Sequence, residues 1–142
     1  TGKAPAAAQA ELAVAKAGVL AAKAEPVGEF QLLVERLDGV GGAGLQGAAQ
    51  SLADQLGDAS AVVLGGLPDP SDLGKVILVA AFGKQVIAAQ LQAGKFIGGI
   101  AKLCGGGGGG RPNLAQAGGR DGSALTDALA KARSELEAGL QS

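Results

Sequence analysis

Two short apolar runs separated by a turn-rich loop most constrain the fold of this chain. Residues 61–64 (AVVL) are wholly apolar, and residues 75–82 (KVILVAAF) carry one charge and no proline. Strands buried on both faces of a sheet have this composition. Residues 65–74 between them contain the Pro and Gly residues typical of a loop. The two runs therefore predict two successive strands in the interior of a sheet that helices cover.

Amphipathic segments supply the other predicted elements. Phe30, Leu32 and Val34 alternate with residues 31, 33 and 35, which predicts a strand. Three helices are predicted from apolar stripes: Leu45, Ala48, Ala49, Leu52 and Leu56, closed by Gly57 as C-cap; Phe96, Ile97, Ile100, Ala101 and Cys104; and Leu125, Leu129, Ala132, Leu136 and Leu140, with Ser123 as N-cap and Asp127 in the first turn. We expect an α/β (α+β) fold, a small mixed sheet covered by helices, over residues 27–142.

An Ala-rich segment precedes this globular part. Residues 4–25 favour a helix that Pro26 ends, with a heptad-like stripe of Ala8, Leu12, Ala15, Val19 and Ala22. Such a stripe packs equally well on its own domain, on a second copy, or as the end of a longer helix. Residues 1–26 are therefore predicted to form a helical linker or dimerisation arm. Because the sequence contains no Met, we expect it to be a piece of a larger protein.

Composition argues against catalysis and metal binding by this chain. It contains no His, which is the usual general base and the commonest zinc ligand, and a single cysteine. We expect Cys104 to be a small buried apolar residue in a reducing compartment. No apolar run is long enough to cross a membrane, so a soluble, cytoplasmic protein is expected.

Charge is distributed unevenly along the chain. Six basic residues and no Asp or Glu lie between Lys75 and Arg120, which gives this window a charge of +6 and the remainder −7. A basic stripe in an acidic chain suggests an anionic partner at one face. A solvated face that happens to be cationic fits equally well.

Residues 105–110 are six consecutive glycines followed by Arg111. Such a run is commonly a flexible linker. Glycine also allows positive φ and close approach of the backbone, so that N–H groups can line an anion-binding concavity. Lys95 and Lys102 are predicted on the solvent side of the preceding helix, which favours phosphate as the anion. No Walker sequence is present.

The stretch GGGGGGRPNLAQAGG, residues 105–119, resembles a signature of alanyl-tRNA synthetases close to GGxGGGRPDMAQAGG. Asn113 and Leu114 stand where that signature usually has Asp and often has Met. The preceding strand and helix and the following helix also resemble the C-terminal, DHHA1-type domain of these enzymes, so the resemblance covers about residues 26–142.

The resemblance implies a non-catalytic domain that binds the outer corner of tRNA(Ala) and assists aminoacylation and editing by upstream domains. It implies tRNA and those domains as partners, with dimerisation as a further role, and neither membrane nor DNA. No cofactor is expected in this piece, whereas the parent enzyme would use ATP, Mg²⁺ and Zn²⁺. Binding by shape and backbone contacts should weaken with salt.

Ten residues are candidates for contact with tRNA. The predicted phosphate contacts are Lys84, Lys95, Lys102, Arg111 and Arg120, and the backbone contacts are Gly106, Gly108 and Gly110. Asn113 and Gln116 could hydrogen-bond sugar or base edges, although Gln116 could instead satisfy the loop backbone. Each lysine alone also fits a solvated surface charge. Phe30 and Phe96 fall on apolar stripes and are interpreted as core residues.

Two rival functions remain at this point. The chain could be a structural module that joins two synthetase subunits. It could also be the substrate-binding half of a DHH-family phosphoesterase, which carries a related glycine-rich domain. Those enzymes commonly have His where this chain has Arg111.

Overall fold

The computed structural model describes residues 24–39, 41–69, 71–89 and 91–141, whose strands form one six-stranded sheet in the order β1-β2-β3-β4-β6-β5. The strands are β1 (Glu25–Val27), β2 (Phe30–Arg36), β3 (Ser60–Gly66), β4 (Val76–Phe82), β5 (Gly107–Gly110) and β6 (Leu114–Gly119). The helices are α2 (Gly42–Leu56), α3 (Lys84–Ala88), α4 (Ala93–Ala101) and α5 (Leu125–Gln141), with 3₁₀ turns η2 (Lys102–Cys104) and η3 (Gly122–Ala124).

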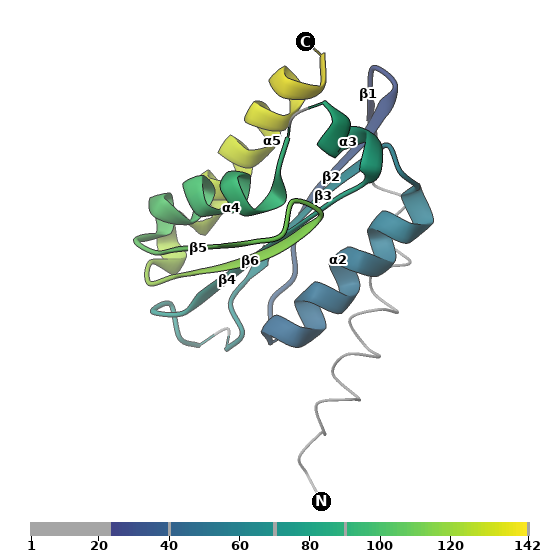
Figure 1. The fold of residues 1–142 in the computed structure, drawn as a ribbon. Helices are drawn as coiled ribbons and strands as arrows, with labels where there is room; N and C mark the ends of the chain where they lie inside the picture. Colours follow the sequence, from purple (N-terminus) through teal and green to yellow (C-terminus); the bar gives the residue numbers. More distant parts are fainter. Residues whose placement is uncertain (1–23, 40, 70, 90, 142) are drawn as a thin grey trace, which may run out of the picture.

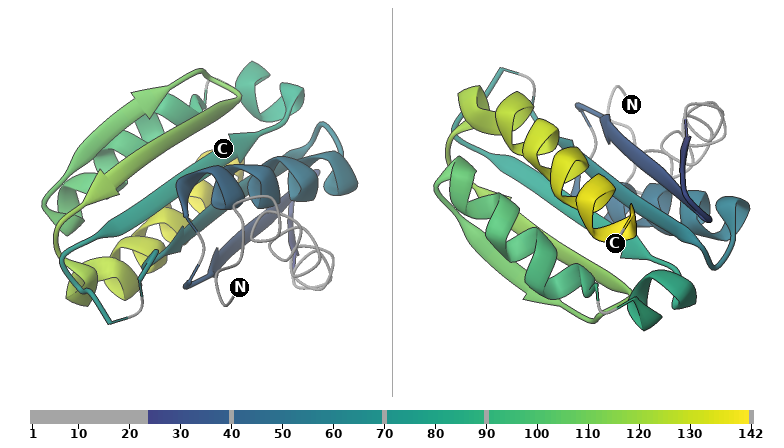
Figure 2. Two further views of the ribbon diagram at one scale, coloured as in Figure 1. Left: turned by 90° about the horizontal axis from the view of Figure 1, so that it is seen from below. Right: turned by 90° about the horizontal axis from the view of Figure 1, so that it is seen from above.

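The sheet is mixed, as predicted. Strands β2 and β3 are parallel because α2 carries the chain back between them, whereas every other neighbouring pair is antiparallel. Helix α2 covers one face of the sheet, and α4 and α5 lie side by side on the other (Figures 1 and 2). The fold is therefore a three-layer α/β/α arrangement.

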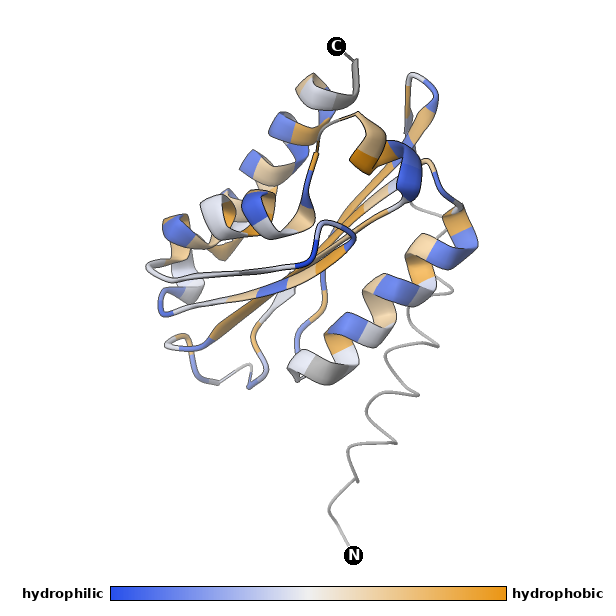
Figure 3. Cartoon of the chain, viewed as in Figure 1, coloured by the Kyte–Doolittle hydropathy of each residue, from blue (hydrophilic) through white to orange (hydrophobic). Residues whose placement is uncertain are grey.

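The two apolar runs are buried on both faces, which confirms the prediction made from them. Ala61 and Val63 of β3 belong to the core under α4 and α5, whereas Val62 and Leu64 belong to the core under α2. Every residue of β3 is buried. Figure 3 shows the apolar colouring along the central strands and polar positions on the outer side of α2.

Several boundaries differ from the sequence expectations. Glu25 is in strand β1 and not in a helix, because Pro26 favours extended backbone at the residue before it. The predicted arm otherwise lies outside the described residues. The N-terminal cap predicted at Ser123 is wrong: Asp121 caps the turn η3 by accepting a hydrogen bond from the backbone N–H of Ser123 at 3.0 Å, and α5 begins at Leu125.

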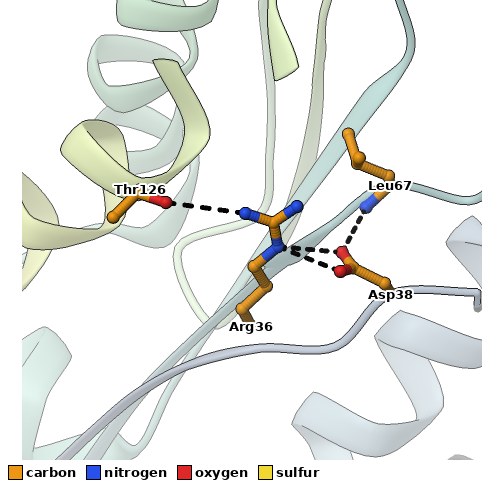
Figure 4. Close-up of polar contacts among 4 residues, drawn as sticks. All are labelled: Arg36, Asp38, Leu67 and Thr126. Carbon is orange, nitrogen blue, oxygen red and sulfur yellow. Dashed lines mark hydrogen bonds and ion pairs between the residues drawn. The ribbon is translucent and has the colours of Figure 1, made fainter. Parts of the chain in front are cut away.

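A polar contact ties the end of the β2–β3 pair to α5. The Nε of Arg36 donates to the carboxylate of Asp38 at 3.0 Å, and its Nη1 lies 3.5 Å from the hydroxyl of Thr126 (Figure 4). The same carboxylate accepts the backbone N–H of Leu67 at 2.9 Å. Asp38 thus holds the chain that leaves β2 against the chain that leaves β3.

Candidate nucleic-acid interface

The glycine run is part of the sheet. Gly107–Gly110 form edge strand β5, paired antiparallel with β6, so the flexible-linker interpretation is wrong. Within residues 105–110, positive φ occurs only at Gly105, at 72°. The Arg111 N–H donates to the Leu114 carbonyl at 3.1 Å, which closes a two-residue turn. Hydrogen-bonded pairs alternate along an antiparallel ladder, so Gly108 and Gly110 direct their peptide groups away from β6.

Helix α4 packs directly on the backbone of this edge strand. A β-carbon added at Gly94 would lie 2.6 Å from the carbonyl oxygen of Gly110, and one added at Gly98 would lie 2.9 Å from that of Gly108. Both distances are too short for any residue but glycine at the helix positions. Gly94 and Gly98 of α4 are therefore required by close packing on the backbone of β5, a reason that the sequence interpretation did not include.

The first of two open grooves beside β5, here called the lysine groove, lies on the α4 side. Its volume is about 600 Å³, and the backbone of β5 and glycines of α4 form its walls. Lys95 and Lys102 line it, and both are exposed as predicted. Gln92 also lines it and was missed, because it precedes the helix and lies outside the predicted stripe. The groove presents peptide groups and two ammonium groups together.

The second groove, here called the arginine groove, lies on the α2 side of the β5–β6 hairpin. It measures about 390 Å³ and is lined by Arg111, Gln116 and Gln46 together with Gly109 and Gly110. The Gln116 side chain lies against Gly42 at the start of α2, where an added β-carbon would be 2.5 Å from its amide nitrogen. Gln46, a half-buried residue of α2, was missed because it lies at the border of the predicted apolar stripe.

The remaining predicted residues lie around these grooves. Lys84 and Asn113 line a third cavity, at the turn end of the hairpin. The Arg120 N–H donates to the Cys104 carbonyl at 2.7 Å, which places Arg120 beside the turn that carries Lys102. Gly106 packs against the carbonyl of Gly118 and lines neither groove. The structure thus distributes the ten candidates around the β5–β6 hairpin.

The predicted cations of this region lack ion-pair partners in the described part of the chain. Among the described residues, none of Lys84, Lys95, Lys102, Arg111 and Arg120 forms a salt bridge. Three of the other basic residues in the described part do: Arg36 pairs with Asp38, Lys131 with Glu135, and Arg133 with both Glu25 and Glu137, whereas Lys75 forms no salt bridge. Unpaired cations distributed along one hairpin create a positive potential that attracts anions.

The environment of Cys104 shifts the pKa of its thiol. Cys104 is fully buried as predicted, and burial raises the pKa of its thiol, with a smaller contribution from the charge of Asp121.

In residues 24–39, 41–69, 71–89 and 91–141, no group of three or more His, Cys, Asp or Glu side chains is placed to hold a metal ion. No helix in that part of the chain is long and apolar enough to cross a membrane.

A mixed α/β/α domain with a glycine edge strand between two polar grooves defines the class of protein, and comparison with known families agrees. The DHHA1 domain family matches residues 29–138, so the chain belongs to that family. The C-Ala domain of alanyl-tRNA synthetase from Aquifex aeolicus has a similar structure, with a TM-score of 0.67 and 27% identity over 84% of this chain and 98% of that one.

Curated relatives narrow the resemblance further. The chain is 89% identical over 140 residues to an alanine–tRNA ligase of Parasynechococcus marenigrum and 80% identical over 141 residues to that of Synechococcus sp. strain CC9902. Each alignment covers 99% of this chain, which spans only 16% of the length of either ligase. The chain therefore has the sequence and fold of the C-Ala type of DHHA1 domain of alanyl-tRNA synthetases, which favours the synthetase over the phosphoesterase interpretation.

Proposed function

We propose that this domain binds the corner of tRNA(Ala) through phosphate and shape recognition, and that it assists aminoacylation and editing by other domains of an alanine–tRNA ligase. The observation that carries the proposal is the set of five cations around the β5–β6 hairpin that have no carboxylate partner in the described part of the chain. The alanine–tRNA ligases that it resembles supply the substrate class.

The lysine groove suits a phosphodiester chain. Lys95 and Lys102 are seven residues apart, which corresponds to about 10 Å along a helix axis. Between them the exposed glycine backbone of β5 allows a phosphodiester chain to approach closely, because the strand carries no side chains. Arg111 extends the same surface around the turn of the hairpin into the arginine groove. RNA helices are recognised mainly by such shape and backbone contacts.

In this proposal the domain carries no catalytic step. The ATP, Mg²⁺ and Zn²⁺ that the parent enzyme would use are assigned to its other domains, and the site of action is the cytoplasm, where tRNA is charged. Gln116, Gln46 and Asn113 offer amide groups for sugar or base edges beside the phosphate contacts.

The test is a salt titration of binding to full-length tRNA(Ala), with an acceptor-stem minihelix as competitor. Affinity should fall linearly on a log–log scale, with a slope of roughly −0.7 to −0.9 per phosphate contact. Lys95→Ala and Lys102→Ala should each lower the affinity and reduce the slope by about one contact. The minihelix should compete poorly, because it lacks the tRNA corner.

Lys131→Ala is the matched control, since it also removes one exposed lysine from a helix, but one that pairs with Glu135 at 4.0 Å. It should leave affinity and slope unchanged. Equal losses in all three variants would mean that only net charge matters. Absence of binding at low salt would refute the proposal, and sedimentation of the same sample would then show whether the chain self-associates instead.

A further inference from the structure

The third cavity differs in character from both grooves. It occupies about 200 Å³ where the end of α2, the start of α3 and the β5–β6 turn meet, and we name it the aspartate pocket. Apolar residues form part of its lining, namely the half-buried Ile87 and Leu114, together with Phe82, whose ring is buried against Phe96 in the core under α4 and α5. Polar side chains line it as well, namely Asp54, Asp58, Lys84, Asn113 and Gln50. An apolar surface with a few convergent polar groups is the usual composition of a small-molecule site.

Backbone hydrogen bonds fix the walls of the aspartate pocket relative to one another. The Gln85 N–H donates to the Asp58 carbonyl, and the Phe82 N–H donates to the Asn113 carbonyl, both at 2.9 Å. Gly83 packs so closely on the Asp58 carbonyl that no β-carbon fits there. Gly57, with φ at 94°, ends α2 and turns the chain into Asp58. Three separate elements therefore form one preorganised cavity.

The polar side chains of the pocket do not satisfy one another. Within the described residues, Asp54, Asp58 and Lys84 form no salt bridge. The two carboxylates also distinguish this pocket from the lysine and arginine grooves, which are lined by no acidic residue. Carboxylates repel phosphate and accept hydrogen bonds from donors. The occupant should therefore be a flat, largely apolar group that presents donors to them.

We propose that the aspartate pocket binds an unpaired guanine base of the RNA, a proposal that rests on the function proposed above. Guanine carries two adjacent donors, N1–H and the 2-amino group, which match a carboxylate of Asp54 or Asp58. Its O6 and N7 are acceptors that match the amide of Asn113 and the ammonium of Lys84. The ring would lie on Ile87 and Leu114. Adenine places an acceptor, N1, where guanine has a donor, so carboxylates disfavour it.

Unstacked bases held by hydrogen bonds at their edges are the usual means by which proteins read RNA sequence. The pocket adjoins the turn that carries Arg111, so a strand whose phosphates follow the arginine groove passes close to its mouth. The phosphate contacts would then position the RNA, and the pocket would select one base.

The test compares GMP, IMP and AMP, which share one phosphate and differ in the base, by amide chemical-shift titration of the whole chain. GMP should shift the amide resonances of Gly57, Asp58 and Gly83. It should also bind about tenfold more tightly than AMP, because a contact with two hydrogen bonds discriminates between the right and the wrong base to about this extent. IMP, which lacks the 2-amino group, should be intermediate. Asp54→Ala combined with Asp58→Ala should abolish the preference, whereas Asp127→Ala, which removes an exposed carboxylate on α5, should retain it.

The outcomes separate this proposal from the proposed function. Equal affinity for GMP and AMP, or a guanine preference that survives loss of both aspartates, would overturn the guanine pocket. Equal shifts from all three nucleotides at Lys95 and Gly107–Gly110, with none at the pocket, would also overturn it and leave phosphate binding intact. A guanine-specific response in a chain that fails to bind tRNA would retain the pocket and refute the tRNA assignment.

Discussion

The backbone contact between α4 and β5 predicts opposite effects for two neighbouring substitutions. Gly98→Ala and Gly99→Ala each add one methyl group to the same turn of α4, and each gains the helix propensity of Ala over Gly, about 1 kcal/mol. At Gly99 an added β-carbon meets no heavy atom within 4 Å. We therefore expect Gly99→Ala to stabilise the fold by about 0.5–1 kcal/mol.

At Gly98 the added β-carbon would lie 2.9 Å from the carbonyl oxygen of Gly108. Helix and strand must then move apart, and overpacking of this kind costs about 1–3 kcal/mol. The cost exceeds the propensity gain, so Gly98→Ala should be net destabilising by up to about 2 kcal/mol. The free energies of unfolding of the two variants should differ by roughly 1–3 kcal/mol. For a chain of this size, each kcal/mol changes Tm by roughly 3–4 °C.

Urea unfolding followed by far-ultraviolet circular dichroism is the suitable assay, because the chain has neither Trp nor Tyr. The midpoints should move in opposite directions, with equal m-values showing that the unfolding transition itself is unchanged. If Gly98→Ala were as stable as Gly99→Ala, α4 would not contact the β5 backbone closely, and the explanation given for the glycines of α4 would fail.

Three further predictions concern single side chains. Asp38→Ala should cost about 1–3 kcal/mol in urea unfolding, because it removes the acceptor of the Leu67 N–H, and Asp38→Asn should cost less. Burial raises the pKa of Cys104, so stability should fall as pH rises from the ordinary value of 9.0 through the folded pKa; a Cys104→Ala variant should lack this dependence. Arg133→Ala should cost no more than about 1 kcal/mol, and less in high salt, because its ion pair with Glu25 is half exposed.

Side chains determine how much of the fold the sequence can predict. The two apolar runs identify β3 and β4, because a strand buried on both faces needs apolar residues at every position. The stripe that ends at Leu56 identifies α2 and its C-cap at Gly57, whose N–H donates to the Ala53 carbonyl. Each of these elements has a period or a length that distinguishes it.

Strand β5 has neither, since its four residues carry no side chain and glycine weakens strands in general. Strand β6 has the alternating residues Ala115 and Ala117 toward α4, but alanine is too small to give a clear strand signal. At Gly108 and Gly110 an added β-carbon would lie 2.6 Å and 2.9 Å from the α-carbons of Ala117 and Ala115 in β6, so these two positions require glycine. Such contacts join residues that no periodicity relates.

The candidate site, like the fold, could be predicted from the sequence only in part. The exposure of Lys95 and Lys102 could be predicted from their helical positions opposite an apolar stripe. Asp54 and Asp58 were missed as site residues, because their pocket exists only where the end of α2 meets the turn of the hairpin. The sequence does not reveal this contact, because Asn113 is more than fifty positions further along the chain than Asp54 and Asp58.

The position of α5 has a consequence for how the domain forms during synthesis. This helix lies over β2 and β3, and Leu125 and Leu129 pack in the cluster that includes Leu32 and Val63. The ribosome completes every strand that α5 covers before it makes the helix, and its 17 residues take about one to three seconds to synthesise. During that interval the nascent sheet exposes an apolar face that can associate with a neighbouring nascent chain, so a pause in translation after Ala124 would expose the domain to aggregation for longer than a pause after Gln141.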